Sequence, residues 1–292
     1  MKPAAFDYVR AESVEHAVQA LAAADGDGKV IAGGQSLMPM MNFRLVKPSV
    51  LVDINRIPGL DTVQMCGDKL VLGALVRHRM TATDTLIAQH IPVLHHAMKH
   101  VAHLTVRNRG TFCGSVCHAD PAAEMPMMSL LLNGIVHIAS PRGGRIIVAK
   151  DFFVGSLMTA LEPDELVIEI EIDTLPAGTG WGFEEFARRH GDYALASAAV
   201  TMRYRDGVAS DVRIGLMGVG EMPMRAPQIE AMLEGRELDA VLIGESVEAL
   251  RAELEPNSDL NASADYRRHL AGVLARRAIT DAWARAKKGA LA

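Results

Sequence analysis

The sequence predicts an α+β fold, in which an N-terminal α/β region precedes a C-terminal region of antiparallel strands and helices. Three observations support this. A strand, a glycine-rich loop, a helix and a second strand follow one another near the N-terminus. Hairpin and helix patterns come next. After a turn-rich segment at residues 175–180, three strand patterns precede three helical ones, which is typical of a separate α+β unit.

The first elements read as a small α/β unit. Ser13 is a suitable N-cap for a helix that Gly26 ends. Apolar runs at 29–32 and 51–54 predict buried strands. A glycine-rich loop and a short helical stretch through residues 40–44 connect them.

The segment that follows alternates hairpins with helices. Gly67-Asp68 is the predicted turn of the first hairpin, and Asn133-Gly134 is a type I′ turn signal in the second. The predicted elements are a hairpin at 63–65 and 70–72, helices at 83–89 and 93–103, a strand pair within 130–139, and strands at 146–148 and 166–172.

A domain boundary is expected in the turn-rich segment at 175–180. We therefore expect an N-terminal domain at residues 1–176, with subdomains at about 1–56 and 57–176, and a C-terminal α+β domain at 177–292. The C-terminal elements are antiparallel strands at 182–188, 194–204 and 212–219, and helices at 227–233, 238–254 and 263–287.

Composition narrows the functional classes. The 292 residues are 49% hydrophobic and 4% aromatic, and the net charge of −5 argues against a non-specific nucleic-acid binder. No apolar run approaches the roughly 20 residues that span a bilayer. The N-terminus lacks the apolar core of a secretory signal, so a cytoplasmic location is expected. Three cysteines cannot hold a four-cysteine iron–sulfur cluster within this chain.

Two glycine-rich segments are the most informative feature. Ala32-Gly33-Gly34-Gln35-Ser36 follows a predicted strand, and Thr111-Phe112-Cys113-Gly114-Ser115 follows Arg109-Gly110. Glycine allows positive φ and close approach of a ligand, so such segments form nests of N–H groups that suit phosphate oxygens. Two of them predict that one diphosphate is held from both sides. That points to a dinucleotide, and FAD is favoured.

Several ordered motifs carry a family resemblance. They are A-G-G-Q-S-L at 32–37, T-V-R-N-R-G-T at 105–111 with Gly114-Ser115 after it, H-A-D-P-A-A at 118–123, L-E-P-D-E-L at 161–166 and F-A-R-R-H-G-D-Y-A at 186–194. With these motifs, essentially the whole chain resembles the FAD-binding medium subunit of molybdenum hydroxylases. This is the group of carbon monoxide dehydrogenase medium subunits and xanthine dehydrogenase FAD-binding subunits.

The resemblance implies an FAD-binding region of the PCMH/VAO type, made of two α/β subdomains, and a C-terminal domain of a small antiparallel sheet with helices. Gln35 stands where His is frequent, which favours non-covalent FAD. Glu124 replaces the usual Asp that binds FAD hydroxyls, Leu166 lies near the flavin or adenine, and Tyr193 covers a flavin face. The cofactor-binding residues predicted in this way are Ala32, Gly33, Gly34, Gln35, Ser36, Leu37, Thr111, Phe112, Cys113, Gly114, Ser115, His118, Asp120, Glu124, Leu166 and Tyr193.

The resemblance also implies partners. A large subunit with the molybdenum cofactor and a small subunit with two [2Fe–2S] clusters are expected, assembled as a dimer of heterotrimers. FAD would collect single electrons from the clusters and release a pair to an external acceptor. No catalytic acid, base or nucleophile is predicted in this chain, so the chemistry is the cofactor's. The substrate of the complex and the acceptor (NAD, oxygen, a quinone or a cytochrome) stay open.

Two alternative functions remain. One is a self-sufficient FAD-dependent oxidase or reductase on the same fold, which would need a substrate cavity and an acid or base at the flavin. The other is an assembly scaffold without cofactor, which the two glycine segments disfavour.

Metal binding is disfavoured for two groups of potential ligands, and a solvated or interface helix is favoured for the group of histidines. Cys113, Cys117 and His118, with Cys66 as a fourth ligand, lack the paired knuckles of structural zinc sites. His96, His100 and His103 share a helical face, but without a carboxylate motif nearby. For Cys113, a small side chain tolerated in the loop is favoured over a redox-sensitive thiol near the cofactor. No metal site is predicted.

Overall fold

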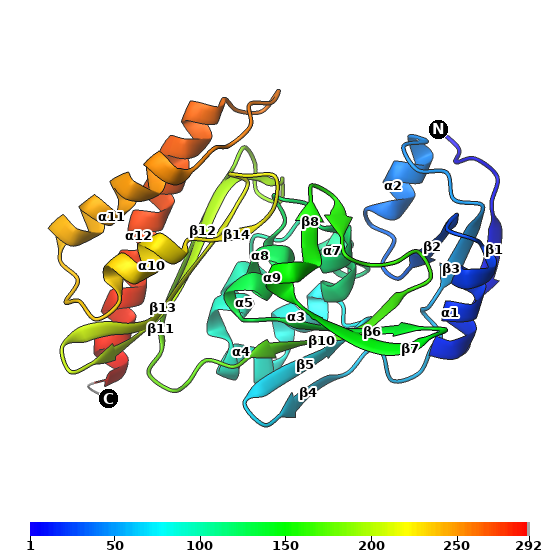
Figure 1. Ribbon diagram of the computed structural model, residues 1–292, viewed down its shortest axis with the longest axis horizontal. Helices are drawn as coiled ribbons and strands as arrows, with labels where there is room; N and C mark the ends of the chain where they lie inside the picture. The colour runs from blue at the N-terminus through cyan, green and yellow to red at the C-terminus, as the bar shows by residue number, and fades with distance from the viewer. Residues whose placement is uncertain (291–292) are drawn as a thin grey trace.

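The computed structural model of the protein describes residues 1–290. Three sheets of three, five and four strands follow one another along an elongated molecule, with a further two-stranded hairpin (Figure 1). Within the described residues, no helix is both long and apolar enough to cross a membrane. The predicted α+β class is confirmed.

The N-terminal sheet is parallel and has the strand order β1–β3–β2. As predicted, Ser13 caps the first helix, because its hydroxyl accepts a hydrogen bond from the amide of His16 at 3.1 Å. The elements of this unit are β1 (Asp7–Arg10), α1 (Val14–Ala23), β2 (Gly28–Ile31), α2 (Leu37–Asn42) and β3 (Val50–Asp53).

The middle sheet is antiparallel and has the order β4–β5–β10–β6–β7. Its strands are β4 (Val63–Cys66), β5 (Lys69–Gly73), β6 (Ile135–Ser140), β7 (Gly143–Val148) and β10 (Leu166–Asp173). The small hairpin pairs β8 (Phe153–Gly155) with β9 (Met158–Thr159). The predicted hairpin around Gly67 and the strands at 146–148 and 166–172 are confirmed.

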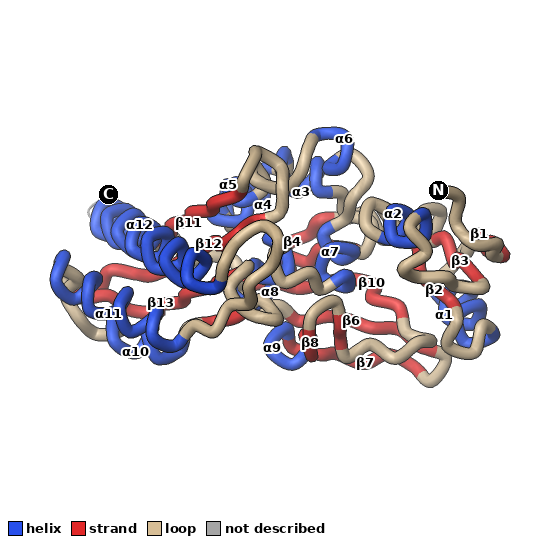
Figure 2. Tube along the Cα trace, turned by 90° about the horizontal axis from the view of Figure 1, so that it is seen from above, coloured by secondary structure: helices blue, strands red, loops and turns tan. Residues whose placement is uncertain are grey.

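Short helices surround the middle sheet. Of these, α7 contacts β5 and β10, while α8 contacts β12 and β13 of the next sheet, so the pair lies between the two sheets (Figure 2). The helices are α3 (His78–Thr83), α4 (Thr85–His90), α5 (Pro92–Ala97), α6 (Leu104–Arg107), α7 (Phe112–His118), α8 (Glu124–Leu131) and α9 (Ala149–Phe152).

The C-terminal sheet is antiparallel, in the order β11–β12–β13–β14, and helices cover one of its faces (Figure 1). A side chain at Gly182 would lie 2.1 Å from the carbonyl oxygen of Ala278, so glycine there lets the last helix pack directly on β11. The elements are β11 (Gly180–Ala187), β12 (Ala194–Arg205), β13 (Val208–Met217), β14 (Met224–Arg225), α10 (Pro227–Leu233), α11 (Ala240–Glu253) and α12 (Ala264–Ala290).

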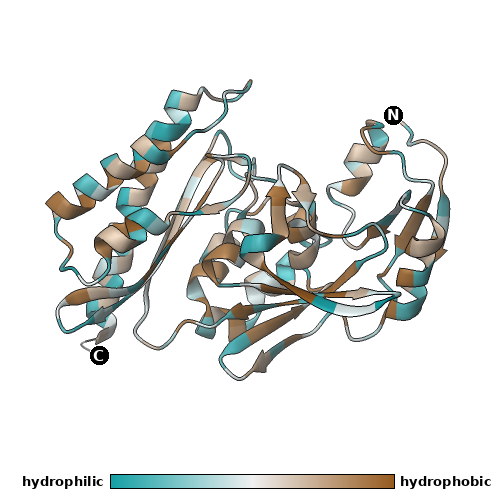
Figure 3. Ribbon diagram, in the orientation of Figure 1, coloured by the Kyte–Doolittle hydropathy of each residue, from teal (hydrophilic) through white to brown (hydrophobic). Residues whose placement is uncertain are grey.

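Two apolar clusters form the core. One spans the first two sheets and reaches Phe183 and Ala199 of the C-terminal sheet. The other lies between that sheet and α10–α12, where the long helix alternates hydrophobic and hydrophilic residues (Figure 3). The first cluster therefore ties the C-terminal sheet to the rest of the chain.

The predicted strand pair within 130–139 is wrong in its first half. Residues up to Leu131 belong to α8, and the chain reverses at Asn133, whose φ is +49°, before β6 begins. Every residue from Met125 to Leu131 is buried, so this helix shows no amphipathic period. A helix buried on all sides therefore resembled a buried strand in the sequence.

The predicted helix at 93–103 is too long. Helix α5 ends at Ala97, and Ala102 adopts a positive φ of +42°. The guanidinium of Arg107 donates hydrogen bonds to the carbonyls of Val101 (2.8 Å) and Ala102 (3.0 Å). These contacts hold the chain in a turn that the apolar pattern did not indicate.

Candidate functional site

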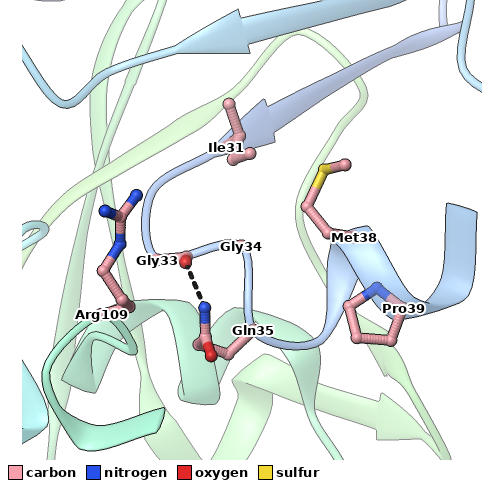
Figure 4. Close-up of a pocket in the computed structure, with 7 residues that line it drawn as sticks. All are labelled: Ile31, Gly33, Gly34, Gln35, Met38, Pro39 and Arg109. Atoms are coloured by element: carbon pink, nitrogen blue, oxygen red, sulfur yellow. Dashed lines mark hydrogen bonds between the residues drawn. The ribbon is translucent and has the colours of Figure 1, made fainter. Parts of the chain in front are cut away.

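The first glycine segment is an open loop that lines a hollow. Residues 32–36 connect β2 to α2, and the hollow beside them has a volume of about 460 Å³ (Figure 4). This volume lies in the range of small-molecule sites. Its lining residues are Ile31, Gly33, Gly34, Gln35, Met38, Pro39 and Arg109. Of these, Ile31, Met38, Pro39 and Arg109 were not among the predicted binding residues.

Glycine is required at position 33 because another backbone touches it. A Cβ there would lie 2.4 Å from the carbonyl oxygen of Arg109 and 2.7 Å from the Cα of Gly110. Gly34 has a positive φ of +69°, and the Gln35 side chain donates to the carbonyl of Gly33 at 3.0 Å (Figure 4). The two glycine-rich parts of the sequence thus meet at Gly33, with Arg109 at the hollow.

The second glycine segment is the first turn of α7, and most of its amides are already bonded. The Thr111 hydroxyl accepts from the amide of Gly114 at 3.0 Å. The amide of Phe112 donates to the carbonyl of Val76 at 3.0 Å, and that of Ser115 to the carbonyl of Thr111 at 3.1 Å. The prediction of a second loop with free backbone amides is therefore wrong, because these amides donate hydrogen bonds within and beside a capped helix.

Two predicted binding residues of this segment point into the core. Phe112 is fully buried and Cys113 is 2% exposed. The Cys113 sulfur lies 3.5 Å from the carbonyl oxygen of Leu72 in β5, and burial raises the pKa of this thiol well above its usual value. Their side chains do not line the hollow. The thiol is a protonated packing group, which agrees with the interpretation favoured from the sequence.

The end of α7 brings acidic groups together. His118 closes the helix, and burial lowers its pKa. The Asp120 carboxylate accepts from the amide of Ala122 at 2.9 Å. Burial, with a smaller contribution from Asp120, raises the pKa of Glu124 to about 7. The raised pKa favours the protonated form of Glu124, which can donate as well as accept hydrogen bonds.

Tyr193 reaches this group from the C-terminal region. It lies between β11 and β12 and is 59% exposed. Partial burial, with Asp120 and Glu124 nearby, raises its pKa to about 12, and the nearby Ser36 hydroxyl opposes this shift. The structure thus brings Ser36, Asp120, Glu124 and Tyr193 to one place. Leu166, by contrast, is buried in the core at the start of β10.

Glu185 was missed by the sequence analysis. Its side chain is 3% exposed, and one of its carboxyl oxygens has no hydrogen-bond partner. The other lies 3.9 Å from the imidazole of His100. Burial and the charge of Glu124 raise the pKa of Glu185 to about 9. No signal in the sequence marks Glu185, because Glu184-Glu185 looks like two ordinary surface acids. Glu185 stands out only in the fold, where β11 places its side chain against the middle part of the chain.

The residues present fit a dinucleotide with a diphosphate. The observation that supports this is the side-chain-free backbone at Gly33, bounded by the Arg109 guanidinium and open to a hollow. The Ser36 hydroxyl, the Asp120 and Glu124 carboxyls and the Tyr193 ring lie near one another, and they offer polar and aromatic groups of the kind that the hydroxyls and ring of such a ligand require.

Comparison with known proteins identifies the family. Residues 4–174 match the family described as FAD binding domain in molybdopterin dehydrogenase. Residues 181–282 match the CO dehydrogenase flavoprotein C-terminal domain. Together these two matches cover most of the chain.

Individual relatives agree over nearly the full length. The chain is 42% identical to the nicotine 6-hydroxylase medium subunit of Paenarthrobacter nicotinovorans, over 98% of this chain and 100% of that protein. A solved carbon monoxide dehydrogenase from Hydrogenophaga pseudoflava, which lacks the Mo-pyranopterin moiety, is similar with a TM-score of 0.95 and 38% identity over 98% and 99% of the two chains. Quinoline 2-oxidoreductase from Pseudomonas putida 86 gives a TM-score of 0.93 and 40% identity over 98% and 99%.

The chain therefore belongs to the FAD-binding medium subunits of the molybdenum hydroxylases, as its motifs predicted. It is an oxidoreductase subunit that carries FAD in complexes of the carbon monoxide dehydrogenase type, in which partner subunits hold the molybdenum cofactor and [2Fe–2S] clusters.

Proposed function

We propose that this chain binds FAD non-covalently along the hollow beside Gly33 and passes electrons from the [2Fe–2S] clusters of a small subunit to an external acceptor. The observation that carries the proposal is the contact of Gly33 with Arg109 and Gly110, which leaves bare backbone beside a cationic side chain. When bound, FAD supplies the capacity to take up electrons singly and to release them in pairs.

The residues around the hollow divide the task of holding FAD. The main chain of residues 32–37 and the Arg109 guanidinium face the diphosphate. His118, Asp120 and Glu124 bind hydroxyl groups, and Tyr193 lies over the flavin and limits the access of water. Thr111, Gly114 and Ser115 shape the second side through the capped turn of α7, with Phe112, Cys113 and Leu166 supporting the site from the core.

The proposal includes the assembly and the domain division. A large molybdenum subunit and a small iron–sulfur subunit complete the heterotrimer, and two heterotrimers form the complex. The division between the FAD-binding and C-terminal domains lies at residues 176–177, where a turn with Gly178 at φ +78° joins β10 to β11. The large subunit binds the substrate, so this chain has no part in substrate choice.

The test is to purify the chain with its co-purifying polypeptides and to release its flavin with acid. We expect one FAD per chain, together with two further polypeptides and iron–sulfur absorbance. Bound FAD on a lone chain that oxidises a small substrate would favour the self-sufficient flavoenzyme instead. An intact complex without flavin would refute FAD binding and favour the role of an assembly scaffold without cofactor.

A further inference from the structure

Two side chains connect the glycine segments through continuous hydrogen bonds. The Asn55 amide donates to the carbonyl of Ala32 at 2.8 Å. Its carbonyl oxygen accepts from one nitrogen of the Arg77 guanidinium, and another nitrogen of Arg77 donates to the carbonyl of Arg109. A path of side-chain hydrogen bonds therefore runs from the backbone beside Gly33 to the backbone that Gly33 touches.

The Asn55 end is held from behind by the N-terminal sheet. The carboxylate of Asp53, the last residue of β3, accepts two hydrogen bonds from Asn55. One comes from its main-chain N–H (2.8 Å) and the other from its side-chain NH₂ group (2.6 Å). The Tyr8 hydroxyl donates to the same carboxylate. Burial acts to raise the pKa of Asp53, but these hydrogen bonds hold it below its usual value. Asp53 is thus a fixed anchor for Asn55.

The Arg77 end is attached to the second segment. Arg77 and Thr111 form an antiparallel bridge. On either side of it, the amide of His78 donates to the carbonyl of Gly110 at 2.9 Å, and the amide of Phe112 to that of Val76 at 3.0 Å. The Arg77 backbone therefore moves with the second segment, while its side chain reaches back to Asn55 in the first unit.

The charges at this connection favour an anion. Arg77 is half-buried, and burial together with the charge of Arg109 lowers its pKa, an effect that Asp53 and Asp61 oppose only in part. The ion pairs found among residues 1–290 involve neither Arg77 nor Arg109. Two like charges close together are unfavourable without an opposite charge, and one of the two, Arg109, lines the hollow. The diphosphate of the proposed cofactor supplies that charge.

We propose that Asn55 and Arg77 are positioning residues that set the spacing of the two glycine segments for the diphosphate of FAD. This inference rests on the proposed function. Arginine is needed because its planar fork reaches two acceptors at once, Asn55 and the Arg109 carbonyl, whereas lysine offers a single ammonium group. Asparagine is needed because it donates to Ala32 and accepts from Arg77 with one side chain.

The test measures the affinity of the flavin-depleted full chain for FAD. Arg77→Lys keeps the charge and loses the fork. Asn55→Asp keeps an oxygen that can accept the hydrogen bond from Arg77. It replaces the NH₂ group that donates to the Ala32 carbonyl with an oxygen, so that this hydrogen bond is lost. We expect either change to weaken FAD binding about tenfold to a hundredfold, as loss of a hydrogen bond to a charged group does. Arg79→Lys and Asn257→Asp, at exposed positions, are the matched controls and should retain wild-type affinity.

Three further measurements separate positioning from a general loss of stability. The affinity for ADP, a diphosphate without flavin, should fall in both variants by a factor similar to that for FAD. The effects of the two substitutions should not multiply in the double variant, because both break one path. The melting temperature of the flavin-free protein reports any structural damage separately.

The outcomes are distinguishable. If both variants lower the melting temperature but bind FAD and ADP like the wild type, the positioning role is refuted and the proposed function stands, provided that Gly33→Val abolishes binding. If the wild-type chain itself binds no FAD, both proposals are refuted. Weakened FAD and ADP binding with normal controls and a non-multiplying double variant supports the inference.

Discussion

The two glycine-rich segments look alike in the sequence and differ in the fold. The first is an open loop whose glycine touches a distant backbone and lines a hollow. The second is the capped start of a helix, where Gly114 makes room for the hydroxyl of Thr111, which would lie 2.5 Å from a Cβ. A glycine can therefore serve a ligand site in one place and a local helix cap in another.

The largest effect on FAD affinity is expected from a substitution in the first glycine-rich segment. Gly33→Val places a side chain against the carbonyl of Arg109, so the segments must separate. We expect FAD affinity to fall at least about a hundredfold, equivalent to roughly 3 kcal/mol. Flavin released per chain measures this. Gly144→Val, on an exposed strand where a Cβ meets nothing closer than 3.5 Å, is the control; equal flavin loss in both variants would contradict the prediction.

Two buried acids, Glu124 and Glu185, should make the stability of the protein depend on pH. Burial and the charge of Glu124 raise the pKa of Glu185 from its ordinary value of 4.5 to about 9, so the folded state holds a proton that the unfolded chain releases between these values. The contribution of Glu185 to stability is therefore fully present below pH 4.5 and is lost as the pH rises toward 9, by up to about 1.4 kcal/mol per pH unit. Glu124, with a pKa of about 7, adds to this decline until the pH passes 7.

Glu185→Gln should flatten that dependence. The melting temperature of the wild type is expected to fall more steeply between pH 6 and pH 9 than that of the variant, measured without FAD. Glu237→Gln, at an exposed position, should follow the wild type. Parallel curves for all three proteins would show that Glu185 is charged in the folded state.

A smaller effect is expected from the second segment. Thr111→Ala removes the acceptor for the Gly114 amide and should cost about 1 kcal/mol of stability. Its FAD affinity should stay within about threefold of the wild type, because the hydroxyl serves the helix. Thermal unfolding and an FAD titration measure the two quantities, and Thr111→Ser should restore stability. A large loss of affinity with normal stability would instead make Thr111 a direct ligand.

The smallest effect concerns the link between the first segment and the C-terminal region. Tyr193→Phe removes the hydroxyl that lies near the Ser36 hydroxyl. The loss of one partly exposed polar group should weaken FAD binding about threefold, or roughly 0.7 kcal/mol. Tyr204→Phe, at the other end of β12 and without a predicted role, is the control in the same fluorescence titration. A change as large as that of Gly33→Val would mean that Tyr193 holds the loop itself.

Local patterns were sufficient for much of the fold. Ser13 before an apolar helical period predicted α1, and Gly67-Asp68 between apolar runs predicted the β4–β5 hairpin, since caps and turns depend on neighbouring residues. Helix α8 was mistaken for a strand because it is buried on all sides. The turn at Ala102 was missed because Arg107, further along the chain, stabilises it.

For the candidate site, the sequence located the first segment and the group around Glu124 through their motifs. It did not distinguish side chains that face the hollow from those that face the core, as Phe112 and Leu166 do. Which way a side chain points at a helix start or strand end depends on the neighbouring sheet, and no local pattern records it.

By itself, the sequence determined the family, the order of strands and helices in most of the chain, and the two glycine-rich segments, because these depend on local conformational preference and on motifs. Only the tertiary structure decided that Gly33 lies against Arg109, that Asn55 and Arg77 join the two segments, and that Glu185 is buried near Glu124. Each of these contacts joins residues far apart in the chain. Their geometry follows from how the sheets and helices pack around the cores, since hydrogen bonds and charge burial require positions that no single segment specifies.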